Sequence, residues 1–500
     1  MRLFITGHGP SLFALIQALF ALISLTSQLV SATSSDCDSS ANSTGVDGDG
    51  IGDGSGSGLL AGRARVDITP PINPNWLPLN EFDLEKLHVR AIVFENNGVR
   101  GAFTCAEVAN YEQLVYQNAA ELVAKYLNTS AAHIVFSATH THGASAAGTG
   151  LFFSTHNYGN EEVNQYANLG EAALEAVKEA SANMVPAKIG YATGDAYLNV
   201  NRDHLNPNTG RWTQYSNFFG PVDREIQILT FVNHNDTPIA VYANYLMHPV
   251  NSYLCGYTSA DWPGAMSRWI EKSFDEKMVA IYVQSASGDV NPRCRRTGTN
   301  VLASIGHMPI TGLELAQEAA EQPIRNFQTP LDRPDVAYVR QLFSELTAIG
   351  IVMGEEMIRL MSKATEWDDN PTIWGKMANI TCPGRKRLDK AREGVPGMYT
   401  NGTDIDVMTG VLGLGKTVIA TVGAEIFTRI GWRIKEESSM ENTFLSTMSN
   451  GWSASGYIPD VASWPQEVFQ ALGSNLMPGS CAEDKITESL VDFIAEYKKL

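Results

Sequence analysis

From about Leu59 onward, short apolar runs rich in β-branched and aromatic residues alternate with longer amphipathic stretches. RAIVFE and GAFTCAEV predict an early β-hairpin, and further strands are predicted at HIVFSAT, PIAVYANYLMHP, MVAIYVQSASGDVNP, KTVIATVGAEIF and NTFLSTMSNGW. Apolar residues recur every three or four positions in NEEVNQYANLGEAALEAVKEASANM and DKITESLVDFIAEYKKL, which predicts helices. A helix is also expected after KTVIATV, with Glu425 in its first turn. Strands that alternate with helices indicate an α/β protein.

Several of these predicted strands end in polar residues. HIVFSAT runs into His140, PIAVYANYLMHP into His248, and MVAIYVQSASGDVNP into a loop at Gly288 and Asp289. NTFLSTMSNGW leads through SASGYIP to Tyr457. Because α/β folds place ligands just beyond strand ends, these residues are candidates for a functional site.

The stretch THTH contains two histidines, His140 and His142, where a buried strand ends. Residues two apart share a face on a strand, but this phase is lost where the chain leaves the strand. The two histidines could therefore chelate one ion, or divide into a metal ligand and a base that faces the substrate. Neutral imidazole nitrogens suit zinc, and three protein ligands with an open position are the catalytic arrangement. A pair of hydrogen-bonded loop histidines is the alternative.

The N-terminal segment predicts the compartment. A basic residue precedes LFALIQALFALISL, and Val30 and Ala32 match a signal-peptidase site, so residues 1–32 are predicted to be a removed secretory signal. An uncleaved anchor is the alternative, but the run is shorter than the ~18 residues that a membrane span needs. Residues 33–58 are almost free of apolar side chains and predict a flexible Gly/Ser/Asp linker. Residues 59–500 have a globular composition without a second such linker, which predicts one large domain. The predicted signal places this domain outside the cell.

Composition supports secretion and excludes one class of partner. N-x-[ST] glycosylation acceptors occur at Asn42, Asn128, Asn235, Asn379 and Asn401. The 6 cysteines form no C-x-x-C pair, which argues against a cysteine zinc site, and some are expected to form disulfides. The formal net charge of -18 leaves no basic stripe for nucleic acid. No segment after the signal has the length and apolarity to cross a membrane.

A series of short motifs resembles the catalytic domain of the neutral/alkaline, non-lysosomal ceramidase family. The motifs occur in this order along the chain: RVDITPP, SATHTHG, LNVNR, MHPVNS, SADWPG, SGDVNPR, VGAEIF and SGYIP. The likeness covers essentially all of residues 59–500. It implies mixed β-sheets flanked by helices in a single catalytic domain, and hydrolysis of N-acylsphingosine to sphingosine and a fatty acid.

The resemblance also implies a zinc ion and the roles of individual residues. The implied zinc ligands are His140, His248, Glu425 and Tyr457. His142 and Arg202 correspond to the groups that hold and polarise the scissile amide and the leaving group. Asp289 and Asn291, in SGDVNPR, complete the expected catalytic set.

Each residue also has a simpler explanation. His248 precedes Pro249 and would fit a buried loop histidine that donates to a carbonyl. Glu425 would fit a helix cap that pairs with Arg429. Arg202 would fit a residue that holds a loop, and two extra residues before Tyr457 leave its alignment with the family motif to judgement. A metal site explains all of these residues together.

The chain departs from the family pattern at the position of the hydroxyl that acts as nucleophile or positions a water. Where ceramidases have serine in GD-x-S-P, this chain has Asn291, and an amide cannot form an acyl-enzyme. An amide can donate a hydrogen bond to an oxyanion or orient a water, so attack by a zinc-bound water is the expected mechanism. NPNWLPLNEFD replaces a glycine-rich segment of the family, and the chain stops at Leu500 without the C-terminal β-sandwich of the family.

The sequence therefore predicts a secreted zinc hydrolase of an amide bond, with a small amphipathic substrate such as ceramide. Such a substrate would also allow transient contact with a membrane surface. Two alternatives stay open: a hydrolase of the same fold that acts on another amide or ester, and a secreted binding pseudoenzyme. Retention of His142 and Arg202 argues against the pseudoenzyme. A TIM-barrel amidohydrolase is excluded because no matching later His and Asp follow strand ends.

Overall fold

The structure is a computed structural model that describes residues 58–70, 86–144, 168–253, 257–293, 336–389 and 394–500. All of them belong to one compact unit, residues 56–500. The predicted signal peptide, nearly all of the predicted linker, Asn42, Cys37, Cys255 and Cys294 lie outside the described residues. Of the helices in the described part of the chain, none is both long and apolar enough to cross a membrane.

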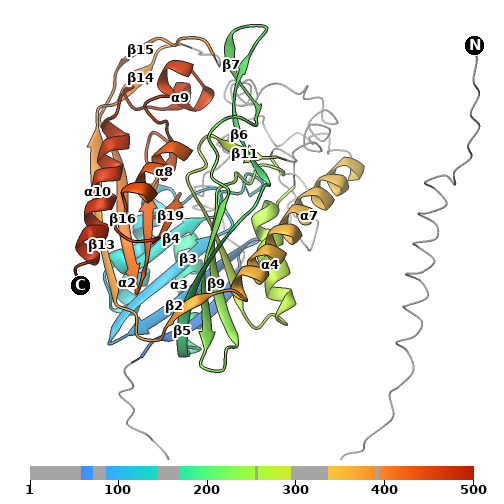
Figure 1. The fold of residues 1–500 in the computed structure, drawn as a ribbon, viewed down its shortest axis with the longest axis vertical. Coiled ribbons are helices and arrows are strands. Elements are labelled where there is room, and N and C mark those ends of the chain that lie inside the picture. The colour runs from blue at the N-terminus through green and yellow to red at the C-terminus, as the bar shows by residue number, and fades with distance from the viewer. Residues whose placement is uncertain (1–57, 71–85, 145–167, 254–256, 294–335, 390–393) are drawn as a thin grey trace, which may run out of the picture. The chain divides into compact units, whose positions relative to one another are not determined.

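A mixed nine-stranded sheet forms the centre of this unit (Figure 1). Its order is β10-β9-β8-β5-β1-β2-β3-β4, with β12 paired to β5. The pairs β3–β4 and β9–β10 are parallel, and the other pairs are antiparallel. The strands are β1 Leu60–Asp67, β2 His88–Asn96, β3 Val99–Ala106, β4 Ile134–Ala138, β5 Val185–Asp195, β8 Glu225–Asn233, β9 Pro238–Tyr245, β10 Val279–Gln284 and β12 Thr365–Asp368.

The predicted early hairpin is confirmed as β2 and β3. Asn97 and Gly98 form its two-residue turn, with φ angles of 50° and 77°. Asn-Gly tolerates two positive φ angles in succession, which a tight hairpin turn requires, and this chemistry sets the strand register.

Helices cover one face of this sheet in two groups. α2 (Gln113–Leu127) and α3 (Leu169–Ala182) pack on the β1–β4 half, and α4 (Asp261–Ser273) and α7 (Val336–Met361) on the β8–β10 half. Side chains alternate along each strand, so Ala91 and Val93 contact the α2–α3 side whereas Ile92 and Phe94 face the opposite way. The opposite face packs on a second sheet.

The second sheet has four strands in the order β13-β16-β17-β19, and α8 and α10 cover its outer face (Figure 1). These elements are β13 Ile373–Cys382, β16 Ile405–Leu414, β17 Thr417–Val422, β19 Asn442–Thr447, α8 Thr428–Glu437 and α10 Cys481–Tyr497. The layers are therefore helix, sheet, sheet and helix. This mixed α/β architecture is the fold class expected from the sequence.

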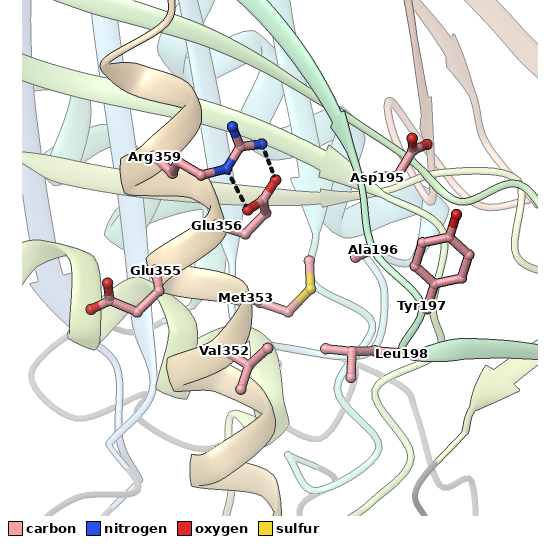
Figure 2. A pocket seen from close by; sticks show the side chains of 9 residues that line it. All are labelled: Asp195, Ala196, Tyr197, Leu198, Val352, Met353, Glu355, Glu356 and Arg359. Atoms are coloured by element: carbon pink, nitrogen blue, oxygen red, sulfur yellow. Dashed lines mark hydrogen bonds and ion pairs between the residues drawn. The ribbon is translucent and has the colours of Figure 1, made fainter.

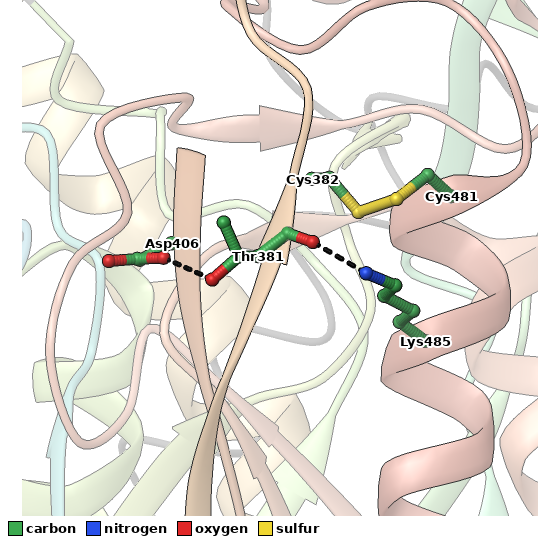
Figure 3. Close-up of a disulfide and its surroundings, with 5 residues drawn as sticks. All are labelled: Thr381, Cys382, Asp406, Cys481 and Lys485. Carbon is green, nitrogen blue, oxygen red and sulfur yellow. Dashed lines mark hydrogen bonds between the residues drawn. A yellow bond between two sulfur atoms is a disulfide. The ribbon is translucent and has the colours of Figure 1, made fainter. Parts of the chain in front are cut away.

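A disulfide joins the second sheet to its covering helix. Cys382 at the end of β13 is bonded to Cys481 at the start of α10, and Lys485 donates to the carbonyl of Thr381 at 2.8 Å (Figure 3). The two cysteines are 99 residues apart, so in the chain-entropy model the bond stabilises the fold by about 4–5 kcal/mol. The other cysteine among the described residues, Cys105, is buried and unpaired.

Three small sheets complete the fold. The three-stranded sheet β11-β6-β7 consists of β11 Val290–Pro292, β6 Asn199–Asn206 and β7 Arg211–Asn217. β14 (Arg385–Arg387) pairs with β15 (Tyr399–Asn401), and the short α9 spans Phe469–Gly473. β18 (Glu425–Ile426) pairs in parallel with β20 (Tyr457–Ile458).

The pairing of β18 with β20 corrects one prediction. Glu425 was expected in the first turn of a helix, but α8 begins only at Thr428 and Glu425 lies in a strand. Pairing with Tyr457 holds the Glu425 backbone extended, a tertiary contact that the local pattern could not reveal. The simpler explanation of Glu425 as a helix cap is therefore wrong as well.

Candidate metal centre

His140 lies two residues past the end of β4 in an unusual backbone conformation. Its φ angle is 66°, a region that residues other than glycine rarely adopt and that often marks functional sites. The His140 backbone N–H donates to Val108 at 3.0 Å, and its ring Nδ1 lies 2.8 Å from the Ala109 carbonyl. A carbonyl can only accept, so Nδ1 carries a proton, and in the neutral ring Nε2 is left with a lone pair for a metal.

His248 lies three residues past β9 and has the same arrangement. Its Nδ1 is 2.8 Å from the Ser287 carbonyl and 3.0 Å from the Val290 carbonyl. Its Nε2 is therefore also unprotonated when the ring is neutral. The side chain is fully buried, and burial together with the Arg202 charge lowers its pKa to about 3, so the neutral form is the stable one.

These lone pairs face one another. The Nε2 atoms of His140 and His248 are 3.1 Å apart, and Glu425 Oε2 lies 2.9 Å from His248 Nε2 and 3.3 Å from His140 Nε2. Three acceptors at these distances repel one another unless a proton or a cation lies between them. Imidazole nitrogens with a carboxylate oxygen are the donor set of zinc and similar divalent ions, so the residues fit a metal.

His142 joins the same group. Its Nε2 lies 3.3 Å from His140 Nε2, and the ligating atoms of His140, His142 and His248 all lie within 4.8 Å of one another. Burial, with the neighbouring His140 and His248, holds the pKa of His142 well below its usual value. His142 is thus neutral, and the geometry permits it to be a metal ligand as well as a base.

Glu425 stays ionised despite its burial. Burial alone would raise its pKa, but His140 and His248 outweigh this effect and hold the pKa well below the usual value. The site therefore places imidazole nitrogens beside a negative oxygen, which favours a bound cation.

Tyr457 is brought to the site by strand register, since it is the direct partner of Glu425 in the β18–β20 pair. Its hydroxyl lies 3.2 Å from Arg202 Nη2. Burial and the Glu425 carboxylate raise the pKa of Tyr457, so the structure shows a protonated phenol at the edge of the histidine group. A phenol can contribute a neutral oxygen to a metal or donate a hydrogen bond.

Arg202 and Asn291 come from neighbouring strands of the three-stranded sheet. Asn291 pairs with Val200, which places its Oδ1 3.3 Å from Arg202 Nη1. The Arg202 guanidinium also donates to the Gly288 carbonyl and stacks on the rings of Tyr457 and Phe469, at 5.5 and 4.8 Å. No carboxylate among the described residues forms an ion pair with it, and its Nε finds no hydrogen-bond partner there. Burial opposes the charge, but Tyr457 and the Asp203 and Glu425 carboxylates outweigh this effect and raise the pKa of Arg202, so the guanidinium stays charged.

Asp289 has a different environment from the one expected of a reacting group. Its Oδ1 accepts from the Thr428 backbone and hydroxyl at 2.9 and 2.7 Å, and its Oδ2 accepts from Asn201 at 3.0 Å. Burial raises its pKa to about 6. These bonds join α8 to the sheet that carries Arg202, which makes Asp289 a positioning residue in this structure.

A cavity of about 520 Å³ lies between α7 and residues 195–198 (Figure 2). Glu356 and Arg359 on its α7 wall pair with each other. The cavity is lined by Asp195, Ala196, Tyr197, Leu198, Val352, Met353, Glu355, Glu356 and Arg359, which include no site residue expected from the sequence. The candidate chemistry therefore belongs to the histidine group rather than to this cavity.

The structure brings the eight expected site residues to one region but also adds partners that the sequence did not suggest. Phe469 and Gln470 in α9 are the clearest examples: Phe469 stacks on Arg202, and Gln470 donates to the Gly288 carbonyl at 3.1 Å. No local signal marks them, because an apolar residue and an amide in a short helix have many ordinary roles.

Comparisons with known proteins agree with the resemblance. Residues 84–304 match the model of the family described as neutral/alkaline non-lysosomal ceramidase, N-terminal. No curated protein matches the chain. The neutral ceramidase from Pseudomonas aeruginosa superposes with a TM-score of 0.61 at 15% identity, covering 89% of this chain and 75% of that one. A structure described as ceramidase complexed with C2 gives a TM-score of 0.61 at 16% identity, covering 89% and 76%.

At 15–16% identity the solved structures support a similar fold only, whereas the family model shows similarity in sequence. The matched segment contains His140, His142, Arg202, His248 and Asn291. Its fold and family are those of a ceramidase-like hydrolase, and its three clustered histidines fit a metal. Residues 84–304 thus match the neutral/alkaline non-lysosomal ceramidase family, and the chain shares the fold of neutral ceramidase.

Proposed function

We propose that this chain is a secreted zinc-dependent amidase that hydrolyses the amide bond of an N-acylated lipid such as N-acylsphingosine. The observation that carries the proposal is the facing of His140 Nε2, His248 Nε2 and Glu425 Oε2 within 3.3 Å of one another. Three such donors with a further open position are the arrangement of catalytic zinc. The family match and the related structure described as a complex with C2 direct the proposal to a lipid amide.

His140, His248 and Glu425 would hold the ion, with Tyr457 or His142 beside them. When bound, zinc lowers the pKa of water towards ~7 and polarises a carbonyl. Hydrolysis adds the water oxygen to the acyl carbon and a proton to the amine nitrogen. His142, kept neutral by burial and its histidine neighbours, can accept a proton if it is not itself a ligand.

Arg202 supplies a fixed positive charge for the oxygen that becomes negative during attack. Its side chain is buried, the nearby Asp203 and Glu425 carboxylates keep it charged, and its Nε–H finds no hydrogen-bond partner among the described residues. Donors that are held in place before the reaction stabilise developing charge without reorganisation, and losing one typically costs ~10²–10³-fold in rate.

Asn291 accepts from Arg202 through Oδ1, which leaves its NH₂ group as a donor. The amide nitrogen is not a nucleophile, so we propose direct attack by water without an acyl-enzyme. Substrate positioning and oxyanion stabilisation are the roles that remain for this side chain.

Two observations support the secreted location. Cys382 and Cys481 form a disulfide, a bond that persists in oxidising compartments. The four glycosylation acceptors in the described part of the chain, Asn128, Asn235, Asn379 and Asn401, are all exposed. Both fit passage through the secretory pathway after removal of residues 1–32.

The decisive experiment measures metal content by mass spectrometry and then turnover of a fluorescent N-acylsphingosine by the same sample. We expect about one zinc per chain, turnover that a chelator abolishes, and no inhibition by a serine-directed reagent. Stoichiometric labelling of a serine with loss of activity would overturn the water mechanism. Zinc without turnover of any amide or ester would instead support a binding protein. A gain in ceramide turnover by Asn291→Ser would show that this position limits lipid amidase activity.

A further inference from the structure

Aromatic side chains gather at the surface beside the candidate site, on and next to the sheet that carries Arg202 and Asn291. Phe219 is 101% exposed and Phe218 is 59% exposed, directly after β7. Tyr215 in β7 and Tyr197 just before β6 are exposed as well. We call Tyr197, Tyr215, Phe218 and Phe219 the aromatic surface. Two adjacent phenylalanines in water are costly, and such patches usually mark an interaction site.

The phenylalanine pair is presented by an ordered turn. Phe219 N–H donates to Asn217 Oδ1 at 3.1 Å, and Gly220 N–H donates to the Asn217 carbonyl at 3.2 Å. Asn217 Nδ2 in turn donates to the Asp203 carbonyl on β6 at 2.8 Å. These bonds order the turn that presents the two rings to solvent, Phe219 fully and Phe218 in large part.

Cations flank this surface in an otherwise acidic chain. Arg293 lies 5.7 Å from the Phe218 ring and donates to the Tyr197 carbonyl at 3.4 Å, and Arg224 lies 5.0 Å from the Tyr197 ring. Both arginines are exposed, and the formal net charge of the chain is -18. Nearby Asp223 and Glu225 share Lys435, each at 2.8 Å. The aromatic surface thus presents two exposed arginines, although the chain as a whole is acidic.

The aromatic surface is continuous with the candidate site. Asn217 pairs with Asn201, the neighbour of Arg202 on β6, and Arg293 directly follows β11, which carries Asn291. Any surface that bound the two phenylalanines would thus lie close to the residues proposed to hold the amide.

We propose that the aromatic surface docks the enzyme on the interface of a lipid bilayer, with Phe218 and Phe219 inserted among the acyl chains and Arg224 and Arg293 at the phosphates. Aromatic side chains favour this interface, and basic residues add attraction to lipid phosphates. Only the choice of a lipid partner rests on the proposed amidase function. Docking here would bring the candidate site to a substrate that resides in the membrane.

Vesicle binding by the full secreted chain tests the proposal without any measurement of turnover. The probes are phosphatidylcholine vesicles, alone and with phosphatidylserine, in co-sedimentation. We expect the double variant Phe218→Ser/Phe219→Ser to bind both kinds roughly tenfold or more weakly, because two rings no longer leave water. Leu114→Ser is the matched control, since Leu114 is 77% exposed on α2, away from this surface. Its vesicle affinity should equal that of the unmodified chain.

Two further variants separate insertion from charge. Arg224→Gln/Arg293→Gln should weaken binding to vesicles with phosphatidylserine more than binding to phosphatidylcholine alone, and the added salt dependence should disappear. Phe219→Trp should retain binding and show an additional blue shift of tryptophan emission when vesicles are added.

Absence of vesicle binding by the unmodified chain would overturn the proposal, as would equal binding by the double serine variant. A lower molecular mass of that variant in sedimentation velocity, with vesicle binding unchanged, would show that the surface joins two copies of this chain instead. Loss of vesicle binding with normal turnover of a dispersed short-chain substrate would support docking and leave the amidase proposal intact. Vesicle binding without turnover of any substrate would support docking and refute the amidase.

Discussion

Two buried polar clusters in this chain are built in opposite ways. In the first, Arg90 lies between Glu107 and Glu271, with N–O distances of 2.6 and 2.7 Å to the two carboxylates. In the second, His140 and His248 turn their lone pairs towards each other and towards Glu425. Donors meet acceptors in the first cluster, whereas acceptors meet acceptors in the second.

The difference separates a structural cluster from a functional one. Arg90 outweighs the effect of burial and lowers the pKa of Glu107 to about 2, so the first cluster satisfies its own charges. In the histidine group, burial lowers the pKa values of His142 and His248, so nitrogen lone pairs face a carboxylate oxygen and favour a bound cation. Burial alone therefore does not identify a site; the balance of donors and acceptors does.

The largest expected effect is the loss of metal and turnover when a histidine of the group is removed. His140→Ala and His248→Ala should each lose bound metal and abolish turnover, while thermal unfolding shows that the fold survives. Both side chains lie on loops after strands, and removing one relieves lone-pair repulsion in the metal-free protein. Metal analysis and a melting curve on the same samples check this, and full zinc occupancy in both variants would refute the ligand assignment.

A second substitution resolves the role of His142. If His142 faces the substrate, His142→Ala should keep the metal and lose turnover by ~10²–10⁴-fold, the usual cost of a missing acid–base group. If it is a third nitrogen ligand, the variant should lose metal and turnover together, as His140→Ala does. Metal content decides between these outcomes independently of the rate.

A matched pair of arginine substitutions compares the clusters directly. Arg90→Met leaves the two buried carboxylates, Glu107 and Glu271, without their shared arginine and should lower the free energy of unfolding by about 3–5 kcal/mol. Arg202 forms no close ion pair among the described residues, and Gln470 still donates to Asp203 and to the Gly288 carbonyl, so Arg202→Met should cost only about 1 kcal/mol while turnover falls. Denaturant titration measures both, and equal losses of stability would contradict the comparison.

The smallest expected effect is a pH-dependent change in the free energy of unfolding. The folded pKa of Glu107, about 2, lies below its ordinary value of 4.5, so its ionised form adds stability above pH 4.5 that is lost as the pH falls towards 2. Glu107→Gln should therefore cost about 3 kcal/mol at pH 7, and the difference from the unmodified chain should shrink below pH 4.5. Unfolding curves at several pH values check this; a constant difference would mean that packing rather than charge is responsible.

The α/β class, the β2–β3 hairpin and the strand before each histidine followed from the sequence, because β-prone apolar runs and an Asn-Gly turn are local signals. The ordered motifs also indicated the family. The long helix α7 and the β6–β7 hairpin were not predicted from the sequence.

Only the tertiary structure decided how the site is assembled. His248 meets Glu425 across 177 residues of chain, and Arg202 meets Tyr457 across 255. Glu425 lies in a strand rather than in the expected helix because its backbone pairs with that of Tyr457. A sequence pattern indicates which residues prefer a strand, a helix or a turn. The protonation of a histidine and the partner of an arginine depend instead on atoms that only folding brings within 3–4 Å.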